Sequence, residues 1–181
     1  MAEWLRGRFG AEITWLPFQL HPEYPPEGLP RAELIARYGP RMETQMADRF
    51  AQEGLAFNPN PDVVPNTTTA LRLTELARDN DSHDAFHDRL MDAYWRDGAD
   101  LGDPEELRRL AHDLPADEVE RVLTTDAYAD RIAASTQQAH SIGIDGIPAF
   151  LLDGKLLVLG AHPRETFERA FAQLAGSASE S

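Results

Sequence analysis

The sequence has 181 residues, with 17 Lys or Arg against 31 Asp or Glu, so its formal net charge is −14. This length suits one domain, or one domain with an insertion, and 42% hydrophobic residues exclude a wholly disordered chain. The negative charge argues against a nucleic-acid partner or an anionic membrane surface. The absence of cysteine excludes disulfides, thiolate metal ligands and a thiol nucleophile within these residues.

Targeting signals are not apparent in the sequence. The N-terminus has no unbroken apolar stretch and no small-residue cleavage site, which argues against a secretory signal. The longest apolar run, residues 156–161, is far shorter than a membrane span. We therefore expect a cytoplasmic protein.

The first 54 residues predict a helix end, a strand and a long helix. Residues 4–9 resemble the last turns of a helix that ends at Gly10. The β-favouring side chains of residues 11–17 predict a short strand with Pro17 at its end or edge. Prolines in residues 21–30 predict a loop, and a helix is then expected from 31 to 53.

Helices are expected to continue as far as Gly143, after a second loop at residues 58–66. Apolar side chains recur at helical spacing through this part of the chain. The predicted N-caps are Asn66 or a following threonine, Ser82, Asp103 before Pro104, and Asp126, with a further short helix at 115–123.

The C-terminal third predicts a β-hairpin and one more helix. Two apolar runs, 149–152 and 155–159, flank Asp153-Gly154, a pair that favours a tight hairpin turn. Because the runs do not alternate with polar residues, we expect helices on both faces of the sheet. Phe167, Ala170, Phe171 and Leu174 keep helical spacing in the last predicted helix.

The order of elements predicts an α/β fold whose strands flank an all-helical insertion. Residues 1–20 and 143–176 are assigned to the α/β domain and residues 31–142 to the insertion. Residues 177–181 are expected to form a disordered tail.

A family resemblance rests on Gly146-Ile-Pro-Ala-Phe150, the following hairpin and Gly160-Ala161. This order resembles the C-terminal half of a thioredoxin fold. Residues 15–22, 65–73 and 90–103 extend the resemblance to the DsbA-like branch with a helical insertion, from about residue 4 to 174. That branch includes polyketide-pathway disulfide oxidoreductases and 2-hydroxychromene-2-carboxylate isomerases.

The resemblance implies a segment that these residues do not contain. Members of the branch begin with a strand that delivers a Cys-Pro-x-Cys motif, or a serine variant in the isomerases, to the start of the first helix. No residue here inherits the nucleophile role, so we assign no catalytic residue. We expect the natural start to lie upstream of Met1. The alternatives are that another chain supplies the strand, or that the strands at 13–16 and 149–152 have moved together.

The resemblance also implies a substrate-binding loop at Ile147 and Pro148. A cis Ile147–Pro148 bond would present the Ile147 backbone to a substrate or to glutathione, and an ordinary trans proline before a strand is the alternative. Gly160, Ala161 and His162 are expected to open the last helix, where N–H groups would hold a carboxylate. A simple strand-to-helix turn explains these three residues equally well.

Two further features have structural explanations as good as functional ones. Asn66 would reach the cleft from the insertion, but capping a helix also accounts for it. His83-Asp-Ala-Phe-His87 places two histidines four residues apart on a helix, as zinc sites do. Because Phe86 should face the core and no third ligand follows at a recognisable spacing, we expect no metal.

The leading functional hypothesis is a DsbA-family thiol–disulfide oxidoreductase homologue without its redox cysteines in this chain. The first alternative is a glutathione-dependent isomerase of the 2-hydroxychromene-2-carboxylate type, the only hypothesis with a cofactor, glutathione. The second is a catalytically inert binding or dimerisation module. The expected partner is a small-molecule or thiol/disulfide substrate, and the assembly state, including a homodimer, stays open.

Overall fold

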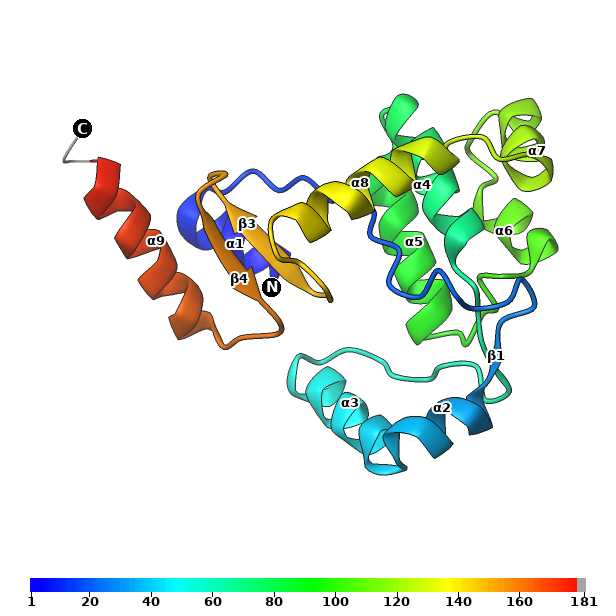
Figure 1. The fold of residues 1–181 in the computed structure, drawn as a ribbon, viewed down its shortest axis with the longest axis horizontal. Coiled ribbons are helices and arrows are strands. Elements are labelled where there is room, and N and C mark those ends of the chain that lie inside the picture. The colour runs from blue at the N-terminus through cyan, green and yellow to red at the C-terminus, as the bar shows by residue number, and fades with distance from the viewer. Residues whose placement is uncertain (179–181) are drawn as a thin grey trace. The chain divides into compact units, whose positions relative to one another are not determined.

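The computed structural model describes residues 1–178, with the side chains of residues 1–176. The chain divides into two compact units (Figure 1). Residues 1–20 and those from 135 onward form the hairpin unit, and residues 21–134 form the helical unit. The second boundary lies inside helix α8 (Ala129–Ser141), whereas the sequence placed it at residue 143.

The helical unit contains six complete helices among its described residues. They are α2 (Arg31–Tyr38), α3 (Arg41–Gln52), α4 (Thr68–Asp79), α5 (His83–Trp95), α6 (Pro104–Leu110) and α7 (Ala116–Thr124). The single helix predicted over 31–53 is wrong, because Gly39 and Pro40 divide it. Gly39 has a φ of 83°, and a proline disfavours helical geometry in the residue before it.

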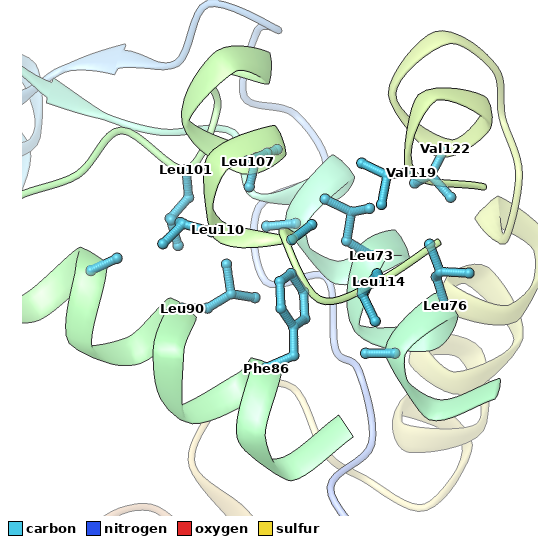
Figure 2. Close-up of a cluster of buried hydrophobic side chains, with 14 residues drawn as sticks. Leu73, Leu76, Phe86, Leu90, Leu101, Leu107, Leu110, Leu114, Val119 and Val122 are labelled. Carbon is cyan, nitrogen blue, oxygen red and sulfur yellow. The ribbon is translucent and has the colours of Figure 1, made fainter. Parts of the chain in front are cut away.

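The core of the helical unit is a cluster of leucines, alanines, two valines and one phenylalanine between the start of α4 and the end of α7 (Figure 2). Leu73, Phe86, Leu107 and Val122 have no exposed surface. Their helical spacing on each element predicted this stripe, and burying it is the main stabilising contribution to the unit.

A short antiparallel pair, β1 (Leu29–Pro30) and β2 (Val63–Val64), connects two segments predicted as loops. Gly28 precedes the pair with a φ of 80°, and a Cβ added there would lie 2.7 Å from the Val64 carbonyl oxygen. Glycine is therefore required for the close approach of these two segments.

The hairpin unit contains α1 (Ala2–Phe9), β3 (Ala149–Leu152), β4 (Leu156–Leu159) and α9 (Arg164–Ala178). The predicted hairpin is confirmed: β3 and β4 are antiparallel, and Asp153 and Gly154 both have positive φ in the turn between them. The predicted helix end is also confirmed, since α1 stops at Gly10 with a φ of 63°.

One face of the hairpin carries the core of this unit. Phe150 and Val158 pack with α1 and α9 in one cluster around the fully buried Phe167. On the opposite face Leu151 and Leu159 are 50% and 46% exposed. The expectation that helices cover both faces is therefore wrong, because α1 and α9 pack on the same side.

The strand predicted over residues 11–17 is not formed. Its side chains alternate as in a strand, with Ala11, Ile13 and Trp15 half-buried between exposed neighbours. However, β3 pairs with β4 alone, and no strand in the described part of the chain pairs with this segment. An apolar alternation without a hydrogen-bonding partner gives an extended segment and not a ladder.

The last helix begins at Arg164, later than predicted, because Gly160 has a φ of 88° and Pro163 favours a helix start directly after it. It runs to Ala178, so it includes residues 177 and 178 of the expected tail, and residues 179–181 lie outside the described residues. No helix over residues 1–178 has the length and apolar character that a membrane span requires.

Candidate functional site

The candidate site begins where α8 ends in a tight glycine turn. Gly143 has a φ of 85° and donates its N–H to the His140 carbonyl oxygen at 3.0 Å. Ile144 donates to the Ala139 carbonyl oxygen at 3.0 Å. This pair of bonds is the Schellman pattern, which closes the helix and directs the chain away from its axis.

A hollow of about 360 Å³ lies beside the loop that follows. It is lined by the loop and by the end of β4: Gly143, Asp145, Gly146, Ile147, Leu159 and Gly160. Ile147 is 57% exposed at its edge. The structure thus brings two predicted site residues, Ile147 and Gly160, to one hollow.

Pro148 joins the loop to the hairpin. The Ile147–Pro148 peptide bond is cis. The Pro148 carbonyl oxygen accepts a hydrogen bond from the Gly160 N–H at 2.8 Å, one residue pair beyond the β3–β4 ladder. This bond uses the Gly160 N–H within the protein, so the expectation that it holds a ligand carboxylate is wrong.

Several backbone groups at the site have no partner among residues 1–178. The N–H and carbonyl groups of Ile147 belong to this set. Because hydrogen-bonded pairs alternate along an antiparallel ladder, the bond between Gly160 and Pro148 directs the backbone groups of Ala149 and Leu151 to the free edge of β3. Such an edge can accept an extended peptide as an added strand.

Asp145 supplies the one ionisable side chain that lines the hollow. Its Oδ1 lies 3.1 Å from Nδ1 of His140, on the last turn of α8. The His140 ring packs against Phe18, with the ring centroids 5.3 Å apart. The pair therefore connects the loop to the end of the helix that precedes it.

Ala161 and His162 lie in the connection between β4 and α9 and do not open the helix. Nε2 of His162 lies 2.8 Å from the Leu159 carbonyl oxygen. Since a carbonyl only accepts, Nε2 carries the proton. Neither residue lines the hollow, so the predicted cluster of three reduces to Gly160 there.

Asn66 belongs to the helical unit, where both ends of its side chain have local partners. Its amide nitrogen donates to the Tyr24 carbonyl oxygen at 2.8 Å, and its oxygen accepts from the Thr68 N–H at 3.0 Å. The N-cap residue of α4 is Thr67, so Asn66 precedes the cap and joins the first residue of the helix to the loop at Tyr24.

The two histidines of the H-D-x-x-H pattern stack face to face on α5, with their centroids 5.9 Å apart. Nδ1 of His83 lies 3.2 Å from Oδ1 of Asp84, and burial lowers the pKa of His87. Phe86 between them is fully buried, as predicted. Over residues 1–178, no three His, Asp or Glu side chains come together as metal ligands would.

A second hollow, of about 450 Å³, lies along α5 and α6. Its arginines are each held by a carboxylate 2.5–2.7 Å away, in the pairs Arg89–Asp113, Arg96–Asp92 and Arg109–Glu106. The hydrogen bond from Arg89 lowers the pKa of Asp113. Because these cations are already paired, we take the hollow at Ile147 as the candidate site.

Asp145 and Leu159 were missed as site residues. The available signal was the sequence Gly143-Ile-Asp-Gly-Ile-Pro148, which places a carboxylate three residues before the proline. The fold was needed to show that the end of β4 returns to the same place.

Three comparisons relate the chain to known proteins. A family model described as a DSBA-like thioredoxin domain matches residues 2–172. The crystal structure of a probable DsbA oxidoreductase from Streptomyces coelicolor is similar, with a TM-score of 0.84 and 32% identity over 94% of this chain and 78% of that chain. The uncharacterized protein YwbO of Bacillus subtilis (strain 168) is 24% identical over 165 residues, 89% of this chain and 81% of that protein.

Proposed function

The chain belongs to the DSBA-like thioredoxin domain family, and from this premise we propose that residues 143–160 form the substrate-binding part of a thiol–disulfide oxidoreductase. The family is of the thiol–disulfide oxidoreductase type, and the fold is a DsbA-like thioredoxin fold with a helical insertion. The family match over nearly the whole chain is the observation that carries the proposal.

The geometry of the loop supports this role. The exposed Ile147 side chain offers an apolar contact, and its backbone N–H and carbonyl have no partner among the described residues. An extended substrate can hydrogen-bond to both groups, as a short added strand does. The substrate we propose is therefore a peptide segment that carries a thiol or a disulfide.

The chemistry of such an exchange sets a limit on what this chain contributes. A thiolate attacks one sulfur of the substrate disulfide, a mixed disulfide forms, and the other sulfur leaves as a thiolate. None of the 181 residues is a cysteine, so none can be the attacking group. These residues bind and align the substrate, and the nucleophile comes from outside them.

The remaining parts of the proposal follow from charge and composition. A net charge of −14 supports a protein or peptide substrate over nucleic acid or an anionic membrane surface.

The test is a titration of the ¹⁵N-labelled chain with a short peptide that contains one intramolecular disulfide. The proposal predicts concentration-dependent shifts at residues 145–151 and 159–160, and no reduction of insulin by the chain itself. Shifts confined to the helical unit, or none at saturating peptide, would contradict it. Shifts at residues 145–151 with glutathione but not with peptide would favour the isomerase.

A further inference from the structure

We propose that the hollow beside Ile147 selects peptides in which a basic side chain neighbours an apolar one, with Asp145 as the residue that recognises the basic group. This inference rests on the proposed function, because it names the class of peptide that the same site takes.

The lining of the hollow sets the chemistry that a ligand meets. Three of the six lining residues are glycines, and a Cβ added at Gly143, Gly146 or Gly160 would have no atom within 4 Å. A ligand can therefore approach the backbone closely. Ile147 and Leu159 supply the apolar contacts.

Asp145 supplies the only charge of the lining, and no Lys or Arg offsets it. In the described part of the chain, the single basic side chain within 4.0 Å of its carboxylate is His140. A neutral imidazole donates one hydrogen bond and leaves the negative charge in place. Oδ2 of Asp145 takes no part in that bond, and the side chain is 87% exposed, so it can reach a ligand.

The charge sign distinguishes between substrate classes. A lysine or arginine next to the apolar side chain would pair with Asp145, whereas an acidic side chain there would be repelled. The two carboxylates of glutathione would meet the same repulsion. Specificity by a single exposed charge is modest, because water and salt screen it.

The experiment compares two fluorescently labelled disulfide peptides that differ only in one position, Lys or Glu, beside the apolar residue. Binding to the full chain is measured by fluorescence polarisation at low salt and pH 8. We expect the Lys peptide to bind more tightly, and Asp145→Asn to reduce its preference over the Glu peptide by about two- to fivefold.

The control is Asp153→Asn at the opposite end of the hairpin, which changes the net charge by the same amount. Asp153 has a φ of 52°, a conformation that asparagine also tolerates, and its carboxylate pairs with Lys155 at 2.7 Å. We expect this variant to keep the preference for the Lys peptide.

The possible failures are distinguishable. If both peptides bind and Asp145→Asn leaves their ratio unchanged, the inference is wrong and the proposed function stands. An equal loss in both variants would assign the preference to overall charge and would also overturn the inference. If neither peptide binds the chain, the proposed function itself fails.

Discussion

Replacing Phe167 by alanine is expected to lower the free energy of unfolding of the hairpin unit by about 3–5 kcal/mol, as for other fully buried phenylalanines. The Phe167 ring has no exposed surface and meets Phe150 edge to face, with centroids 4.9 Å apart and planes at 80°. Such a ring pair adds about 0.5–1.5 kcal/mol beyond burial, which favours the upper half of that range. Phe150 lies in β3 two residues after Pro148, so the cavity would form beneath the strand that carries the loop.

The matched control is Phe86→Ala, because Phe86 is also fully buried but belongs to the core of the helical unit. Urea unfolding followed residue by residue in ¹⁵N spectra separates the two units, whose transitions need not coincide. We expect only Phe167→Ala to shift the native resonances of residues 143–148. Where that variant does not fold, Phe167→Leu keeps most of the volume and should cost less than Phe167→Ala.

Two results would contradict this role of Phe167. A cost below about 1 kcal/mol for Phe167→Ala would show that the ring is not part of a packed core. An equal disturbance of residues 143–148 by Phe86→Ala would show that the loop does not depend on the hairpin core in particular.

Three further predictions concern single residues outside that core. Asp103→Ala removes the side chain that accepts a hydrogen bond from the Glu105 N–H at 2.9 Å. We expect it to lower the free energy of unfolding of the helical unit by about 0.5–2 kcal/mol, measured by urea unfolding. Asp103→Asn keeps an acceptor oxygen and should change the free energy of unfolding little. Burial lowers the pKa of His87, so the folded state binds this proton less readily than the unfolded state. The contribution to stability is therefore complete above about pH 6.5 and falls as the pH drops below that value. His87→Gln should weaken this pH dependence in unfolding curves measured between pH 5 and 8. Gly160→Ala should lower the free energy of unfolding by about 1–2 kcal/mol, because Gly160 has a φ of 88°. An added Cβ there meets no atom within 4 Å, so the backbone conformation is the cause. Gly146→Ala, at a position without positive φ, should be nearly neutral, and differential scanning fluorimetry compares the two variants.

Local patterns predicted those elements whose signals lie within a few residues. The hairpin follows from Asp153-Gly154 between two apolar runs, and α6 follows from Asp103-Pro104. In both cases the turn or cap residue supplies the backbone geometry that the element requires. The resemblance carried by Gly146-Ile-Pro148 agrees with the family match over residues 2–172.

The failures arose where a distant partner decides the structure. The alternation of residues 11–17 is typical of a strand, but a ladder also needs a neighbouring strand, which no local pattern reports. The pair β1–β2 joins Leu29 to Val64 across thirty-four intervening residues, with only two residues in each strand. The division of the predicted helix at Gly39-Pro40 was available locally and was missed.

In the candidate site, too, some residues follow from a local motif and others only from the fold. Ile147 and Pro148 were identified from one short motif, and both lie at the hollow or directly beside it. Leu159 became a site residue only when the hairpin brought the end of β4 back to the loop, whereas Asp145 stands in the same short motif and was missed. Asn66 was expected either to reach the cleft or to help start a helix, and its side chain bonds the Tyr24 carbonyl oxygen and the Thr68 N–H within the helical unit.

A crystal structure of this chain with a disulfide-containing peptide bound would test the substrate-binding role of the Ile147 loop most directly. We expect an extended peptide beside Ile147, hydrogen-bonded to the Ile147 backbone, with its disulfide within the hollow of Gly143 to Ile147 and Leu159. A peptide bound at the helical unit, or beside Leu151 without contact to Ile147, would contradict it.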